Sequence, residues 1–165
     1  MSNEYRREVP IARPESVVSL YQEFGGELWR ALLVVSGGRS DVAEDAVAEA
    51  FARYLSHYPT VRDPRAWLYR TGFRIVVAEM KRERRDRGLP AVQAEDAVSM
   101  LSLGLRDALR GLTPEQRLVA FLVYEADLPL AEVARLTGSS VAAVKMRLHR
   151  ARRALRDELR EDTSV

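Results

Sequence analysis

Residues 130–155 constrain the fold of this chain most, because three of them occur at the spacing of a helix-turn-helix. That motif needs a small residue inside its first helix, a glycine in the tight turn and an apolar anchor in its second helix. Ala134, Gly138 and Val144 supply these at spacings of four and six. Glycine suits the turn because a positive φ costs other residues more. The spacing therefore predicts a short helix, a tight turn and a long final helix over 140–160.

The final helix is predicted to have one apolar face and one basic face. Its apolar residues recur at intervals of three and four, which is helical periodicity: Val141, Val144, Leu148, Ala151 and Leu155. The side chains expected to point away from them are Lys145, Met146, His149, Arg150 and Arg153. A recognition helix has this geometry, since one side packs on its own domain and the other enters the major groove of DNA. An amphipathic hairpin with an arginine-rich surface is the alternative interpretation.

The rest of the chain also shows helical periodicity and no strand pattern. Ser40 is expected to cap a helix that turns Leu55 inward, and Thr113 to Gln116 form a capping box. Helices are predicted over 14–35, 41–56, 64–85, 117–125, 130–136 and 140–160, with a loop over 57–62. We therefore expect an all-α chain with two small helical domains. The predicted boundaries are 15–86 for the first domain, 87–104 for a linker and 105–160 for the helix-turn-helix domain.

Basic residues concentrate in two segments of a chain whose net charge is only +2. Residues 65–87 hold eight basic and three acidic side chains, and residues 145–156 hold six basic side chains and no acidic one. Such concentrations indicate two places that contact phosphate. Solvated helix ends are the alternative interpretation.

The helix that begins at Pro64 mixes aromatic and basic side chains. Its start is marked by Asp63 as a capping carboxylate and by proline in the first helical position. Rings that stack on exposed bases and guanidinium groups that hold the backbone suit single-stranded DNA. The candidate DNA-binding residues are Arg65, Trp67, Tyr69, Arg70, Phe73, Arg74, Lys81 and Arg82. For any single ring, a place in the core is the favoured interpretation.

Taken in order, four segments resemble the extracytoplasmic-function (ECF) sigma factors, the smallest class of the sigma-seventy family. The four segments are Asp41-Val-Ala-Glu44-Asp45-Ala-Val-Ala-Glu49-Ala-Phe51, Asp63-Pro-Arg-Ala-Trp-Leu-Tyr-Arg70, Leu112-Thr-Pro-Glu-Gln-Arg117 and Val141-Ala-Ala-Val-Lys-Met-Arg-Leu-His-Arg-Ala-Arg152. The resemblance covers about residues 15–86 and 105–158. Each motif alone is moderately specific, and their order makes the resemblance strong.

The resemblance implies a role for each surface. Residues 15–86 would be region two, whose acidic helix docks on the clamp helices of core RNA polymerase through Asp41, Glu44, Asp45 and Glu49. The helix from Pro64 would bind the −10 element, and residues 105–160 would be region four. In region four Lys145, Met146, His149 and Arg150 would face the −35 element, while Arg147, Arg152 and Arg153 would hold phosphate. The implied partners are core RNA polymerase (clamp helices and flap), promoter DNA and an anti-sigma factor.

The sequence departs from the family pattern at four positions. Ala48 replaces a glutamine of the acidic helix, Arg74 and Ala78 replace an asparagine and an aspartate of the −10 helix, and Met146 replaces a serine. Two other functions stay open on the residues alone. One is a helix-turn-helix regulator that needs only residues 105–160, and the other is a sigma-like protein that acts mainly through protein contacts.

An enzyme is the weakest interpretation of the sequence. It contains no glycine-rich phosphate loop and no nucleophile paired with a base. It has no cysteine, and His57 and His149 lack the spacing of zinc ligands. Charged residues near the start exclude a signal peptide, and the longest apolar run, 31–35, is too short to cross a bilayer. We therefore expect a cytoplasmic protein with no cofactor, no metal and no membrane segment.

Overall fold

The computed structural model describes residues 14–58, 60–87, 109 and 111–162, which form six helices and no strand. The helices are α1 (Pro14–Val35), α2 (Ser40–His57), α3 (Pro64–Arg87), α5 (Pro114–Tyr124), α6 (Leu130–Thr137) and α7 (Val141–Asp162). The all-α prediction is confirmed, and each predicted helix is present with ends shifted by no more than about a turn. The predicted linker, apart from Arg87, lies outside the described residues.

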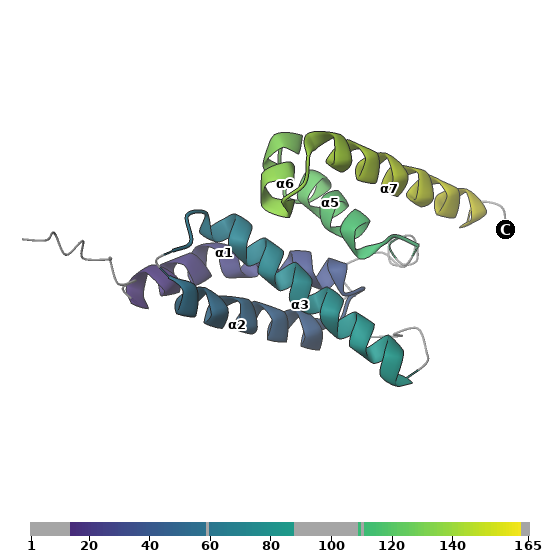
Figure 1. The fold of residues 1–165 in the computed structure, drawn as a ribbon. Coiled ribbons are helices and arrows are strands. Elements are labelled where there is room, and N and C mark those ends of the chain that lie inside the picture. The colour runs from purple at the N-terminus through teal and green to yellow at the C-terminus, as the bar shows by residue number, and fades with distance from the viewer. Residues whose placement is uncertain (1–13, 59, 88–108, 110, 163–165) are drawn as a thin grey trace, which may run out of the picture.

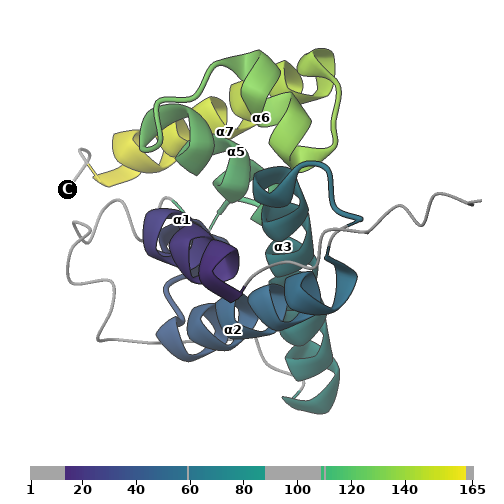
Figure 2. The same ribbon diagram turned by 90° about the vertical axis from the view of Figure 1, so that its left-hand side faces the viewer.

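The helices form two groups that pack directly on each other. Helices α1, α2 and α3 make the N-terminal group, and α5, α6 and α7 make the C-terminal group, which lies over α1 and α3 with α2 on the far side (Figures 1 and 2). The main contacts between the groups join α1 to α5 and α3 to α6. The aromatic and basic helix α3 and the helix-turn-helix of α6 and α7 are thus brought side by side.

One apolar core runs through both groups. Leu28 and Leu32 of α1 are fully buried, as is Leu122 of α5, and all three belong to a single cluster of buried side chains. Burying a leucine contributes about 1.5–3 kcal/mol relative to leaving it exposed. Burial of these apolar side chains therefore stabilises the contact between the groups.

The turn between α1 and α2 begins with a Schellman motif. Gly37 has a φ of 76°, its N–H donates to Val34 O at 3.2 Å, and the N–H of Gly38 donates to Leu33 O at 2.8 Å. Ser40 is not the N-cap that the sequence suggested. Arg39 takes that position with extended backbone, its carbonyl accepts from the N–H of Ala43, and no side chain caps the helix.

The second group starts as the sequence predicted. Thr113 accepts a hydrogen bond from the N–H of Gln116 at 3.2 Å, and Gln116 Oε1 accepts from the N–H of Thr113 at 3.0 Å. This reciprocal pair is a complete capping box, and it begins α5 at Pro114. Because these partners are three residues apart, the sequence alone was enough to place them.

Two residues predicted to face inward are exposed. Leu55 is 51% exposed near the end of α2, whereas Tyr54, which was also predicted to face inward, is buried. Val141 is 38% exposed in the first turn of α7, because the apolar contact of that helix begins only at Val144. Periodicity places residues on a helix face, but it does not show where the neighbouring helices stop.

Candidate nucleic-acid interface

Helices α6 and α7 are held at a fixed angle by a glycine turn and a buried seam. Gly138 ends α6 with a φ of 65°, and the N–H of Ser139 donates to Ala134 O at 2.9 Å. Val133 of α6 and Val144 of α7 are fully buried. The Oγ of Ser140 accepts from the N–H of Ala143 at 3.1 Å and caps α7. The helix-turn-helix predicted from Ala134, Gly138 and Val144 is thus present.

The outward face of α7 is exposed to solvent. All five side chains predicted to point away from the apolar stripe are exposed: Lys145, Met146, His149, Arg150 and Arg153. Met146 is the most apolar of them and is 56% exposed. A helix with a free polar face and one exposed thioether fits the major groove, where an apolar side chain can contact a thymine methyl.

Two further arginines of α7 are held by neighbours. Arg147 is half-buried and donates from Nη1 to the Oγ of Ser139 at 2.6 Å. Arg152 donates from Nε to the hydroxyl of Tyr124, and its guanidinium lies over that ring at 5.5 Å from the centroid. Tyr124, on α5, is a positioning residue that the sequence did not reveal, because it lies 28 positions from Arg152 with no local signal to link them.

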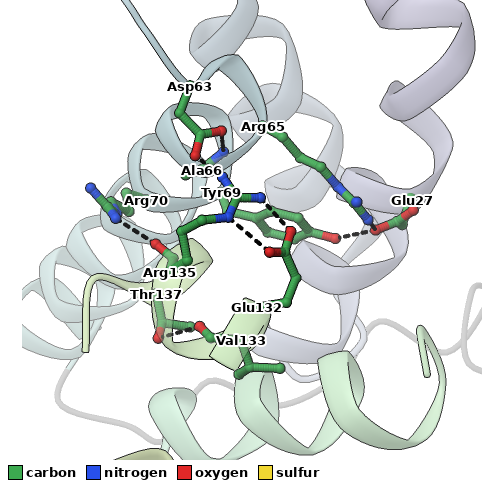
Figure 3. A network of polar contacts seen from close by, with 10 residues as sticks. All are labelled: Glu27, Asp63, Arg65, Ala66, Tyr69, Arg70, Glu132, Val133, Arg135 and Thr137. Carbon is green, nitrogen blue, oxygen red and sulfur yellow. Dashed lines mark hydrogen bonds and ion pairs between the residues drawn. The ribbon is translucent and has the colours of Figure 1, made fainter. Parts of the chain in front are cut away.

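The start of α3 is tied to α1 by a partly buried polar network. Asp63 caps α3 by accepting from the N–H of Ala66 at 3.1 Å. Glu27 of α1 accepts from Arg65 Nη2 at 2.6 Å and from the hydroxyl of Tyr69 at 2.7 Å (Figure 3). Burial raises the pKa of the Tyr69 phenol, and the bond to Glu27 raises it further. Burial alone would lower the pKa of Arg65, but the hydrogen bond and charge of Glu27 raise it overall.

Tyr69 is therefore a correction to the predicted DNA-binding set. Its ring is fully buried and packs edge-on against Phe24 at 5.1 Å, which leaves no face on which a base could stack. Trp67 is half-buried, with its ring 5.9 Å from that of Tyr54 and 5.7 Å from that of His57. The core interpretation thus holds fully for Tyr69 and partly for Trp67.

The remaining N-terminal half of α3 faces the C-terminal group. Arg70 and Arg74 are exposed, and Phe73 is half-buried. They line a hollow of about 320 Å³ whose opposite wall includes Ser139 and Arg147. We call this space the inter-group hollow. It brings residues predicted to bind two different promoter elements to the same place.

The other half of α3 forms an acidic groove with α2, of about 780 Å³. Three of the four acidic residues predicted to dock on polymerase line it, and Glu44, although exposed, does not. Three acids of α3 that the sequence analysis did not select join them, so the carboxylates of the acidic groove are Asp41, Asp45, Glu49, Glu79, Glu83 and Asp86. The spacing of the three on α3, i, i+4 and i+7, is a helix-face signal that would have identified them.

Arginines moderate the charge of the acidic groove. Arg39 pairs with Asp41 at 2.9 Å and also with Glu83, and the bond from Arg39 lowers the pKa of Asp41. Arg82, predicted to bind the −10 element, is exposed, pairs with Glu79 at 2.6 Å and lies on the groove wall. Lys81 is exposed beside it. Six carboxylates against two guanidinium groups leave the acidic groove strongly negative.

Comparison with known proteins shows similarity to sigma factors over both helix groups. The family described as "Sigma-70, region 4" matches residues 102–155. The ECF RNA polymerase sigma factor SigL of Mycobacterium tuberculosis is 32% identical over 157 residues, which cover 87% of this chain and 88% of SigL. The similarity therefore extends well beyond the helix-turn-helix.

Two solved structures share the fold. The sigma factor RpoE of Bartonella quintana, solved with the anti-sigma factor NepR, has a TM-score of 0.71 at 19% identity and covers 88% of this chain and 98% of RpoE. CnrH, solved with the cytosolic domain of CnrY, has a TM-score of 0.68 at 25% identity and covers 92% of each chain. Among the residues described, no helix is long and apolar enough to cross a membrane.

Proposed function

This chain belongs to the ECF RNA polymerase sigma factors, which bind core RNA polymerase and direct it to promoters. On that premise we propose which surface of the chain binds polymerase and which surfaces bind each promoter element. Region two corresponds to residues 15–86 and region four to residues 105–160. The relative covers both, so a regulator that uses only the helix-turn-helix does not account for the similarity. Catalysis of RNA synthesis belongs to the polymerase, and the chain itself supplies recognition in the cytoplasm, where transcription takes place.

The acidic groove docks on the clamp helices of polymerase. Its carboxylates present a negative surface, and complementary charge speeds and orients the encounter of two proteins. Ala48 lies on the wall of the groove, at a position where the family has a glutamine. This chain therefore presents a methyl group there in place of a side-chain amide. Region four adds a contact with the polymerase flap.

The N-terminal half of α3 binds the −10 element. Arg70 and Arg74 provide exposed guanidinium groups for the DNA backbone, and Phe73 and Trp67 offer partly exposed rings for unstacked bases. Arg65, held by Glu27 and by a ring contact of 5.4 Å with Phe24, fixes the start of the helix rather than reaching outward. Arg74 stands where the family has an asparagine, which favours phosphate contact over base reading at this position.

Helix α7 reads the −35 element. Arg150 is the candidate for a bidentate contact with guanine, since arginine in the major groove makes that pairing most often. Lys145, Met146 and His149 lie on the same exposed face. Arg147, Arg152 and Arg153 contact phosphate, which orients the helix without specifying sequence.

One observation carries the proposal: a single chain carries a strongly acidic groove and, elsewhere on its surface, the basic face of a helix-turn-helix. The test is transcription from a selected promoter by core polymerase with this chain. Asp45→Lys reverses one charge in the groove and should abolish copurification with core polymerase, while Glu125→Lys, an exposed position outside the groove, should not. Equal binding by both variants, or no initiation by the unaltered chain, would refute the assignment.

An anti-sigma factor is a further partner. RpoE was solved with the anti-sigma factor NepR, and CnrH, 25% identical to this chain, with the cytosolic domain of CnrY. We therefore expect a protein that binds this chain and competes with polymerase. Pull-down from the native cell with the whole chain, followed by competition against core polymerase, tests this expectation.

A further inference from the structure

The inter-group hollow, of about 320 Å³, has walls of mostly positive charge. Arg70 and Arg74 of α3 and Arg147 of α7 line it, and Glu115 of α5 is the one carboxylate among its described lining residues. Three guanidinium groups against one carboxylate leave an excess of positive charge. Sites for small molecules occupy about 300–1,000 Å³. The inter-group hollow therefore has the size and the charge to bind a small anion.

Two of the three arginines are held in place by hydrogen bonds. Arg147 donates from Nη1 to the Oγ of Ser139 at 2.6 Å. Arg70 donates from Nη2 to the carbonyl oxygen of Arg135 (Figure 3). Its Nε lies against Gly138, where an added Cβ would be only 3.1 Å away. Each bond uses one N–H of a guanidinium and leaves the others to pair with an anion. Because these side chains are already ordered, binding an anion costs them less conformational entropy.

Arg74 supplies the third charge from an exposed position. It lies one helical turn after Arg70, so the two side chains share a face of α3. Within the described part of the chain, Arg74 makes no hydrogen bond or ion pair that would compete with a ligand. Ser139 adds a neutral donor, because its Oγ accepts from Arg147 and its own hydroxyl proton is left to donate. The donors of the hollow thus come from α3, from α7 and from the turn before α7.

We propose that the inter-group hollow binds a small ligand with a diphosphate group, either pyrophosphate itself or a nucleoside diphosphate. Arginine pairs with phosphate through two parallel hydrogen bonds. Because the guanidinium groups come from two helices, two adjacent phosphates can pair with both walls, whereas a single phosphate has fewer oxygens to share among them. The half-buried ring of Phe73 lines the same hollow and gives the base of a nucleotide an apolar surface.

This site goes beyond the surfaces assigned above to polymerase and promoter. It uses residues of both helix groups, Arg74 from one and Arg147 from the other, and needs neither polymerase nor DNA. Arg70 and Arg74 are also candidate contacts of the −10 strand, so a DNA phosphate is the alternative occupant. Glu115 makes a further test possible, since a carboxylate in the wall repels an anionic ligand and its removal should strengthen binding.

Isothermal titration calorimetry of the whole chain with sodium pyrophosphate, without magnesium, tests the site. We expect saturable binding at one site per chain, about tenfold tighter than the binding of orthophosphate. Arg147→Gln and Arg74→Gln should each weaken pyrophosphate binding about tenfold, as loss of a charge-assisted hydrogen bond allows. Glu115→Gln should strengthen it about threefold, because a like charge is removed.

Each variant has a control with the same change of charge. Arg156→Gln matches the two arginine variants, and Glu125→Gln matches Glu115→Gln. Both control positions are exposed and outside the hollow. Circular dichroism checks that helix content is unchanged. If the unaltered chain shows no saturable binding, or if the variants match their controls, the site is overturned and the proposed function stays untouched.

ADP identifies which form of the ligand the hollow prefers. Tighter binding of ADP than of pyrophosphate, lost in Phe73→Leu, identifies a nucleoside diphosphate. Affinity for ADP no greater than for pyrophosphate identifies pyrophosphate.

A short oligothymidine tests the alternative occupant. Arg147→Gln should bind it within about twofold of Arg156→Gln, because single-stranded DNA is assigned to α3 and Arg147 belongs to α7. If Arg147→Gln loses oligothymidine and pyrophosphate binding by the same factor, the hollow is part of a DNA surface and the diphosphate site is overturned.

Discussion

Arg117 is the position where a single substitution should most change the relation between the two helix groups. Its guanidinium is buried between α5 and α1, and it donates to Val35 O at 3.0 Å and to Leu109 O at 2.7 Å. Burial lowers the pKa of this group, yet the hydrogen bonds to backbone carbonyls compensate part of the cost of removing it from water. In Arg117→Met, an apolar chain of similar length would occupy the same space without donors.

The expected cost follows from the two carbonyls left behind. Leaving the buried Val35 carbonyl without its donor costs about 1–3 kcal/mol. The bond to Leu109 is only partly buried, so water can replace the guanidinium there and the loss is about 1 kcal/mol or less. We therefore expect Arg117→Met to lower the free energy of unfolding by about 1–4 kcal/mol in total, and the part lost at Val35, about 1–3 kcal/mol, weakens the contact between the groups.

The loss should appear as a separation of two unfolding transitions. Both tryptophans, Trp29 and Trp67, lie in the N-terminal group, so their fluorescence follows that group, whereas circular dichroism follows all helices. In urea the two signals should coincide for the unaltered chain, whose core is continuous. In Arg117→Met they should separate, with the C-terminal group unfolding first. Arg153→Met, the same change at an exposed site, should alter the free energy of unfolding by less than about 0.5 kcal/mol. Coincident signals and an unchanged midpoint in Arg117→Met would refute this account of the interface.

Four further outcomes are expected. Arg150→Ala should weaken binding to the −35 element by about 1–3 kcal/mol in a sequence-dependent way, and a uniform loss across duplexes would make Arg150 a phosphate contact. Arg152→Ala should lower the slope of log affinity against log salt by about one unit, and an unchanged slope would contradict its role. Gly138→Ala should lower the free energy of unfolding by about 1–2 kcal/mol, since φ is 65°. Gly26→Ala, in α1 with open space where its Cβ would lie, should raise it by about 0.5–1 kcal/mol. Urea denaturation measures both changes. As pH rises above about 10, the Tyr69→Phe variant should lose less stability than the unaltered chain. In the unaltered chain the buried phenol stays protonated when folded but ionises on unfolding, which favours the unfolded state. Urea titrations in which both proteins show the same pH dependence would contradict this.

Much of the fold could be predicted because its signals are local. The capping box at Thr113 and Gln116, the proline start of α3 and the glycine turn at Gly138 each depend on residues within three or four positions. The exposed face of α7 followed from periodicity for the same reason, as every one of its predicted outward side chains proved exposed.

The candidate site was harder to predict where it depends on distant partners. Tyr69 was placed among DNA-binding residues because it lies in an aromatic and basic helix, but Glu27, 42 positions away, accepts its hydroxyl and the ring is buried. Arg82 was assigned to DNA for its charge. It pairs with Glu79, three positions away, and lies on the wall of the acidic groove, whose other wall is formed by the distant helix α2. Local composition could not tell which side of α3 faces α2.

The sequence by itself determined the helices, their ends to within about a turn, and the helix-turn-helix, since backbone hydrogen bonds, caps and turns act over a few residues. Only the tertiary structure decided that α6 lies against α3, that Arg70 bonds to the end of α6 and that Arg117 reaches Val35 O across 82 positions. Such contacts depend on the summed shape and charge of whole helix faces, which no single segment encodes. For that reason the exposed basic face of α7 could be predicted from the sequence, and the packing of α6 against α3 could not.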